Sequence, residues 1–173
     1  WQIHDVRTPQ DIAMIAGPGG ALEAFVEAKA SGVVRFIGVT GHHNPRILTQ
    51  AVREWPVDAV MMPANPVEHI LGGFLTDTLP AARKKGVAVI GMKVLGAAHY
   101  ILAQAQITAA ALIRYALSFD IDVAIVGCST PAEVNTLAEA GRMTKPLAEE
   151  DRRYLLSVFK PIARRLAYYR GVL

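Results

Sequence analysis

Cysteine is almost absent from this sequence, because Cys128 is the only one among 173 residues and no internal disulfide can form. A chain without disulfides fits a reducing compartment, so we expect a cytoplasmic protein. Charged residues make up only 19% and hydrophobic residues 52%, a balance typical of a globular chain rather than a disordered one. No apolar run reaches the roughly 18 residues that a membrane span needs, and no signal peptide is evident. We therefore expect no membrane partner.

The net charge is small, +3, and the positive excess lies late in the chain: Arg142, Lys145, Arg152, Arg153, Lys160, Arg164, Arg165 and Arg170. Such a group is typical of the solvated face of a helix. No motif of interleaved aromatic and basic residues accompanies it, so we expect no nucleic-acid partner.

Short β-rich apolar runs alternate with segments of helical periodicity. The runs cover residues 33–40, 59–63, 87–94 and 123–128, and residues 1–4 resemble the end of another. They are continuously apolar, which is typical of strands buried on both faces of a parallel sheet. The pattern predicts an α/β fold. It fits either a five-stranded doubly wound sheet or part of a (β/α)8 barrel, which needs about 250 residues when complete.

Capping signals mark the helices between these runs. Helices are predicted at 21–30, at 46–55 after Asn44-Pro45, from Pro80 to a stop at Gly86, at 109–117 after Thr108, and after the capping box of Thr130 and Glu133. A last amphipathic stretch covers 147–169, and Pro161 should kink or split it.

Active sites of both architectures lie at the carboxyl ends of the strands. The histidines follow the predicted strands there: His4, His42, His43, His69 and His99. His4 is the candidate we favour, because it stands directly at a strand end and imidazole readily supplies a donor or an acid near neutral pH. A rival hypothesis is a metal-dependent hydrolase on a barrel rim, with ligands from His4, Asp5, His42, His43 and His69. No His-x-His pair supports it, so we predict no metal.

The end of the last predicted strand is a second candidate site. Gly127-Cys128-Ser129-Thr130 leads into a capped helix, whose N-terminus could bind a phosphate. Glu133 would repel a phosphate placed close to it, and Thr130 and Glu133 could simply cap the helix. Lys93 lies within an apolar run, where it could reach a phosphate, form a Schiff base or point outward at the strand end.

Four blocks of the sequence, taken in order, resemble the aldo-keto reductases, and the later ones resemble a bacterial branch. They are Ile3-His4-Asp5, residues 20–40 with Gly32 and Arg35-Phe36-Ile37-Gly38-Val39-Thr40, residues 89–96, and residues 126–133. The resemblance implies a (β/α)8 TIM barrel of aldo-keto reductase type. Residues 1–173 would form one partial domain, the C-terminal half from the end of strand 4 to helix 8 plus a C-terminal helix.

The family reduces aldehydes and ketones to alcohols with NAD(P)H, using a tetrad of Asp, Tyr, Lys and His. The resemblance places His4 on the tetrad histidine, while the other members lie upstream of Trp1. It therefore implies an oxidoreductase with a small carbonyl substrate, in which the 173-residue chain alone is inactive. The alternative is a half-barrel that binds a nucleotide without catalysis. We expect self-association through the open half-barrel.

The cofactor positions that the resemblance carries over are Thr40, Gly41, Met61, Met92, Lys93, Leu95, Gly96, Gly127, Cys128, Ser129 and Glu133. The implied cofactor is NADP(H), with NAD(H) as the alternative. Gly127 and Glu133 stand where many members have cations for the 2′-phosphate, which weakens the case for NADP(H). We therefore predict that the two cofactors differ in affinity by less than about tenfold.

Overall fold

The computed structural model describes residues 1–143 and 147–171, so Lys145 of the late basic group lies outside the described residues. Five parallel strands form one sheet, and they lie side by side in chain order: β1 Gln2–Ile3, β2 Gly38–Thr40, β3 Ala59–Pro63, β4 Ala88–Met92 and β5 Val123–Ala124. A doubly wound sheet reverses its strand order at a switch point, whereas a barrel does not. The order seen here is therefore that of a barrel segment.

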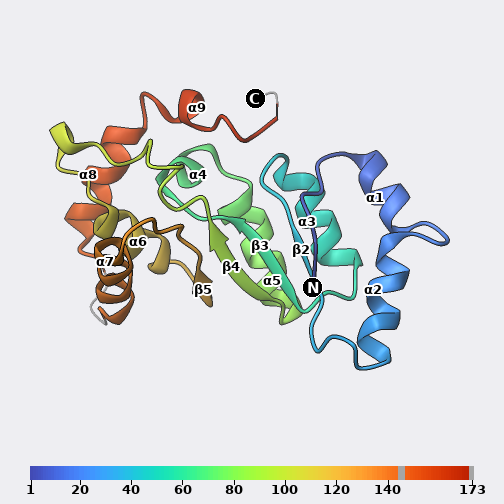
Figure 1. The fold of residues 1–173 in the computed structure, drawn as a ribbon. Helices are drawn as coiled ribbons and strands as arrows, with labels where there is room; N and C mark the ends of the chain where they lie inside the picture. Colours follow the sequence, from blue (N-terminus) through green and yellow to red (C-terminus); the bar gives the residue numbers. More distant parts are fainter. Residues whose placement is uncertain (144–146, 172–173) are drawn as a thin grey trace.

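Helices connect successive strands, and most of them cover the same face of the sheet (Figure 1). Their bounds are α1 Pro9–Ala16, α2 Ala21–Ala30, α3 Pro45–Glu54, α4 Pro66–Leu71, the π-helix η1 Phe74–Thr78, α5 Leu79–Lys85, the 3-10 helix η2 Ala103–Ala105, α6 Ala109–Leu117, α7 Pro131–Arg142, α8 Glu149–Phe159 and α9 Ala163–Leu166. None of these helices is both long enough and apolar enough to cross a membrane.

The predicted helix punctuation is confirmed. Asn44 and Thr108 accept hydrogen bonds from N–H groups of the first turns of α3 and α6. Thr130 and Glu133 form the predicted capping box of α7, and Gly86 ends α5 with a left-handed φ of 73°. The last amphipathic stretch splits into α8 and α9 on either side of Pro161. Local signals of this kind are reliable because each satisfies a backbone group that the helix leaves unpaired.

Strands β1, β2 and β5 are shorter than predicted. Residues 33–37 do not join β2, and Val33 and Phe36 are 66% and 62% exposed. The predicted run 123–128 contributes only β5, although the Ile125 amide still donates to Gly91 O over 2.8 Å. A strand extends only as far as a neighbour supplies pairing groups, and β1 is two residues long. Helices α1 and α4 were not predicted.

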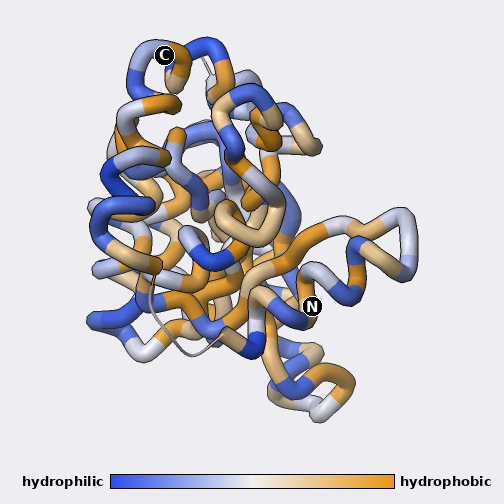
Figure 2. Tube along the Cα trace, turned by 90° about the vertical axis from the view of Figure 1, so that its left-hand side faces the viewer, coloured by the Kyte–Doolittle hydropathy of each residue, from blue (hydrophilic) through white to orange (hydrophobic). Residues whose placement is uncertain are grey.

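Only one face of the sheet is covered, which corrects the prediction that the strands are buried on both faces. Val60, Met62 and Val89 belong to the core beneath α3 and α5. Met61 and Ile90 pair across β3 and β4 and are half-buried on the opposite face. In a closed barrel that face would line the interior. Figure 2 shows hydrophobic segments gathered mainly in the middle of the molecule and hydrophilic ones mainly at its periphery.

Candidate functional site

A cavity of about 420 Å³ opens at the carboxyl ends of β4 and β5. It collects the predicted residues Lys93, Leu95, Gly96, Gly127, Cys128, Ser129 and Glu133. The rest of its wall is mostly apolar and includes Ile113 and Val126. A concave, largely apolar cavity with a few polar groups is the usual form of a small-molecule site. The two segments singled out by sequence, 92–96 and 127–133, therefore meet in one place.

Helix α7 begins at the wall of this cavity, and Glu133 occupies its N-terminus. Glu133 Oε2 accepts hydrogen bonds from the amides of Ser129 and Thr130 over 2.5 and 3.3 Å, while its own amide donates to Thr130 Oγ1 over 3.2 Å. The amides of Ser129 and Thr130, which could bind a phosphate, thus already hold a carboxylate. A Cβ built on Gly127 meets no atom within 4 Å, so the cavity is open beside that residue.

Lys93 stands at the end of β4 with a left-handed φ of 56°, which is uncommon for a residue with a side chain. Its carbonyl accepts a hydrogen bond from Asn65 Nδ2 over 3.1 Å, and its ammonium lies 6.0 Å from the centre of the Tyr169 ring. Gly96 follows with a φ of 53°, and a Cβ there would come within 2.5 Å of the Tyr100 ring. The 93–96 turn is therefore held firmly in place.

The remaining cofactor candidates, Thr40, Gly41, Met61 and Met92, do not line this cavity and lie on β2, β3 and β4 or directly after β2. Thr40 pairs with Met61 across β2 and β3, and the Gly41 amide donates to Met61 O over 3.2 Å. Met92 immediately precedes Lys93, and both methionines are half-buried on the uncovered face of the sheet. A Cβ on Gly41 would lie 3.1 Å from Val6 O, which explains why a larger residue does not fit here without movement.

His4 lies at the same edge of the sheet but far from the cavity. It follows β1, and three strand spacings separate β1 from β4, which is about 14 Å along the sheet. Its side chain is exposed. The next residue, Asp5, is buried, pairs with Arg7, and has its Oδ1 3.5 Å from His42 Nε2. The structure therefore brings Asp5 and His42 together and leaves His4 open to solvent.

A group that the sequence did not reveal lies over the strand ends: the segment 167–171, which crosses above the sheet after α9 (Figure 1). Tyr169 donates to Glu68 Oε1 over 2.7 Å and accepts from Asn65 Nδ2 over 3.0 Å. Arg170 pairs with the same carboxylate. His42 Nδ1 lies 3.2 Å from Tyr169 O, and burial lowers the pKa of His42. Asn65-Pro66 repeats the signal of Asn44-Pro45, so α4 and its cap could have been predicted.

No family model and no curated protein sequence matches the chain. Solved structures do match it. An aldo-keto reductase from Bacillus halodurans in its holo form superposes with a TM-score of 0.70 at 17% identity, over 91% of this chain and 57% of that chain. A thermostable aldo-keto reductase bound to the inhibitor epalrestat gives 0.63 at 20%, over 91% and 58%. A glycerol dehydrogenase from Gluconobacter oxydans gives 0.63 at 15%, over 92% and 57%.

The fold is that of the aldo-keto reductases. The chain spans less than two thirds of the length of each of these neighbours, as expected for part of their barrel. The predicted fold class, with only part of the barrel present, is confirmed, and the doubly wound alternative is not.

The tetrad that the resemblance implies needs a tyrosine that can give up a proton, and Tyr169 contacts Asn65 and His42 at the strand ends. Its hydroxyl is turned into the protein, where it bonds to Glu68 and Asn65. Burial, followed by the negative charge of Glu68, raises its pKa well above the ordinary value. A buried hydroxyl with a raised pKa holds the segment in place and is a poor proton donor for a substrate.

The rival hypothesis of a metal-dependent hydrolase has little support in the geometry. Within residues 1–143 and 147–171, no group of three or more His, Cys, Asp or Glu side chains is placed to hold a metal ion. His69 belongs to α4 rather than to a loop, and its Nδ1 lies 2.8 Å from Tyr115 Oη and 3.5 Å from Arg152 Nη2. It thus lies apart from the pair of Asp5 and His42.

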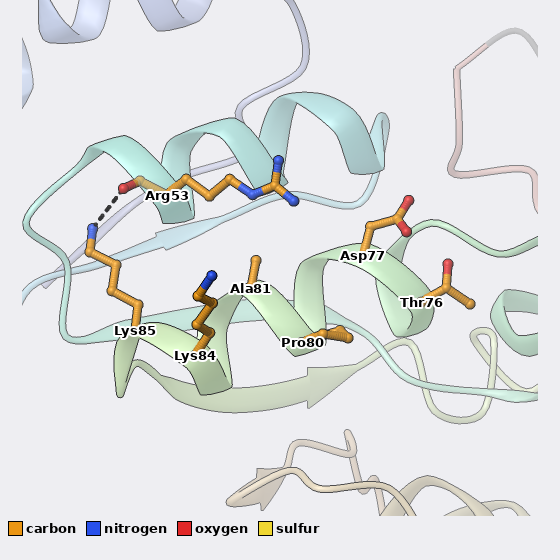
Figure 3. Close-up of a pocket in the computed structure, with 7 residues that line it drawn as sticks. All are labelled: Arg53, Thr76, Asp77, Pro80, Ala81, Lys84 and Lys85. Atoms are coloured by element: carbon orange, nitrogen blue, oxygen red, sulfur yellow. Dashed lines mark hydrogen bonds between the residues drawn. The ribbon is translucent and has the colours of Figure 1, made fainter.

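A second cavity, of about 560 Å³, lies on the outer helix layer rather than at the strand ends (Figure 3). It runs between α3 and α5, with Arg53 and the Lys84-Lys85 pair near one end and Asp77 near the other. Lys85 Nζ donates to the carbonyls of Val52, Arg53 and Trp55. This lysine therefore caps the C-terminus of α3, and the hollow is a groove between two helices.

Proposed function

We propose that this chain is the nicotinamide-nucleotide-binding part of an oxidoreductase that reduces aldehydes or ketones to alcohols with NAD(P)H. The observation that carries the proposal is the cavity at the ends of β4 and β5, on an aldo-keto reductase fold, with Lys93 on its wall. In barrels, the loops after the last strands are the usual place for a phosphate. A cytoplasmic location and a bacterial origin belong to the same proposal.

The residues around the cavity fit a ligand with one anionic centre and a planar apolar part. Among the residues described around it, Lys93 is the one cation, and the firmly held 93–96 turn places it at the strand end. Its ammonium would bind a pyrophosphate oxygen. Leu137, Ile125 and Ile113 would contact the adenine, since all three line the cavity.

The nicotinamide end of the ligand would extend along the sheet toward β3 and β2. The Met92 and Met61 thioethers could pack against the ring there, and the Thr40 hydroxyl, which accepts from the Asp5 amide over 2.8 Å, retains a proton to donate to a carboxamide. When bound, the cofactor supplies the hydride that reduces the carbonyl carbon. We propose that His4, exposed at the end of β1, orients the carbonyl oxygen.

Tyr169 is not available to give the proton that completes the reduction, because its hydroxyl is buried and bonded to Glu68. We therefore expect the isolated chain to bind the dinucleotide without reducing an aldehyde, and expect the tetrad members other than His4 to come from a part of the barrel outside these 173 residues. We thus propose that the isolated chain is a non-catalytic half-barrel and that the complete protein is an oxidoreductase.

Calorimetric titration of the chain with NADH and NADPH tests the proposal. We expect saturable binding to at least one dinucleotide and a loss of at least fivefold in affinity for Lys93→Met. Lys84→Met is the matched control, because it removes an equal charge from the groove between α3 and α5 and should leave binding unchanged. Equal losses in the two variants, or no binding of either dinucleotide at millimolar concentration, would overturn the proposal. A nicotinamide oxidation assay with a reactive aldehyde then separates binding from turnover.

A further inference from the structure

Besides Lys93, the proposed nucleotide site has a second charged group, the Glu133 carboxylate, which lies at the N-terminus of α7. Glu133 is exposed, and both N–H groups that it accepts from bond to the same atom, Oε2. Its other oxygen, Oε1, is therefore left to accept a further hydrogen bond. Among the described residues on the cavity wall, Glu133 is the one acid, as Lys93 is the one cation. The wall thus offers one place to an anion and another to a hydroxyl donor.

A dinucleotide can satisfy both Lys93 and Glu133 in one orientation. Its pyrophosphate is anionic and belongs beside Lys93, and the ribose hydroxyls of its adenosine are donors that belong beside Glu133. In the doubly wound NAD-binding fold, an acidic side chain accepts a hydrogen bond from the ribose 2′-hydroxyl, and Glu133 offers the same chemistry on a different fold. A 2′-phosphate at that place would face the Glu133 carboxylate, and the amides of Ser129, Thr130 and Glu133 beside it are already hydrogen-bonded.

We infer that the cavity takes NAD(H) in preference to NADP(H), and that Glu133 is the residue that sets this preference. The inference rests on the proposed function, since it concerns the same cavity. The sequence alone predicted a difference of less than about tenfold in either direction. The two hydrogen bonds that Glu133 accepts hold its carboxylate at the place of the 2′-substituent, which favours the cofactor without a 2′-phosphate. We therefore expect NADH to bind at least tenfold more tightly than NADPH.

No other cation reaches the N-terminus of α7 from the described part of that helix. Arg142 lies at its far end, eleven residues after Pro131, which corresponds to about 16 Å along the axis. Lys93 is engaged by the pyrophosphate in this arrangement. Gly127 is the position where a cation could be added, because a side chain there enters open space.

Binding constants of NADH and NADPH, measured by calorimetry on the wild-type chain and on three variants, test the inference. Glu133→Gln keeps a side chain that can complete the capping box and removes the charge. Glu139→Gln makes the same change of charge at an exposed position of α7 outside the cavity wall. The double variant Gly127→Lys with Glu133→Gln adds a cation. Adenosine 5′-phosphate and adenosine 2′,5′-bisphosphate serve as probes of the adenosine end alone.

We expect Glu133→Gln to bring the two affinities within threefold of each other, Glu139→Gln to leave the wild-type ratio unchanged, and the double variant to favour NADPH. The bisphosphate should follow NADPH and the monophosphate NADH. Tighter binding of NADPH by the wild-type chain, equal binding of both, or equal effects of the two glutamine substitutions would overturn the inference and leave the proposed function standing. Failure of either dinucleotide to bind would overturn both.

Discussion

The hydroxyl of Tyr169 donates a hydrogen bond of 2.7 Å to the carboxylate of Glu68, which lies 101 residues earlier in the chain. Glu68 is fully buried, and burial raises its pKa, while Arg170 and Tyr169 act in the opposite direction. A buried carboxylate is tolerated only when its partners are in place. The segment 167–171 is therefore bound to the strand ends by polar contacts that α4 presents from below.

Replacement of Tyr169 by phenylalanine should destabilise the protein by about 1–3 kcal/mol, because it removes the donor to Glu68 and the acceptor of Asn65 while both remain buried. Tyr168→Phe is the control, since Tyr168 is 52% exposed and its hydroxyl should matter by less than about 0.5 kcal/mol. Urea unfolding followed by circular dichroism measures both. A loss in the control as large as that in Tyr169→Phe would contradict this account.

The contribution of His69 to stability should fall between about pH 7.5 and pH 5.5. Burial first, and the charge of Arg152 second, lower the pKa of His69. The unfolded chain, with a histidine pKa near 6.5, then binds more protons than the folded one in this window. The stabilisation is fully present at pH values above the pKa of His69 in the unfolded chain. It is lost as the pH falls toward the lower pKa that His69 has in the folded protein.

The comparison of wild type with His69→Gln isolates this contribution, because the lowered pKa of His42 and the raised pKa of Glu68 act in both proteins. We expect the free energy of unfolding to depend less steeply on pH in the variant than in wild type across the window. If the free energies of unfolding of the two proteins changed in parallel with pH, His69 would not change its protonation on unfolding in this window.

Lys85 should contribute to stability as a cap of α3, whereas its neighbour Lys84 should not. Lys85 Nζ donates to the carbonyls of Val52, Arg53 and Trp55, the last over 2.5 Å, at the negative end of the helix dipole (Figure 3). Lys85→Met should therefore lower the free energy of unfolding by about 1 kcal/mol. Lys84→Met, one residue earlier and exposed, should change it by less than half of that. Denaturant titrations of the two variants decide between them.

The chain should associate with itself at high concentration through the open sheet. The uncovered face and the edge strands β1 and β5 expose apolar groups and unpaired backbone groups. Ile125→Lys places a charge beside β5, where Ile125 is 47% exposed. It should reduce association measured by light scattering. Met14→Lys, which changes a 70% exposed residue of α1, should not. A wild-type chain that stays monomeric at all concentrations would contradict the prediction.

The parts of the molecule that the sequence could predict are those with local causes. Caps such as Thr130 with Glu133, and strand β3 with its unbroken apolar run, depend on neighbours within a few residues. The overlooked α1 and α4 carry the same kind of signal in Thr8-Pro9 and Asn65-Pro66. The contact of Glu68 with Tyr169 has no local signal. The strand pattern alone predicted burial of both faces, whereas the resemblance predicted an open half-barrel, so the uncovered face agrees with the resemblance and not with the pattern.

The separation of Glu68 and Tyr169 along the chain also affects folding during synthesis on the ribosome. A ribosome that adds about 5–20 residues per second reaches Tyr169 roughly 5–20 s after Glu68, because Tyr169 follows Glu68 by 101 positions. Throughout that interval the Glu68 carboxylate has neither the hydroxyl nor the guanidinium that accompanies its burial. We expect strands β2 to β4 to be able to pair during synthesis, while burial of the ionised Glu68 carboxylate waits for its partners. On this account the strand ends of the nascent chain stay hydrated until Tyr169 and Arg170 have left the exit tunnel.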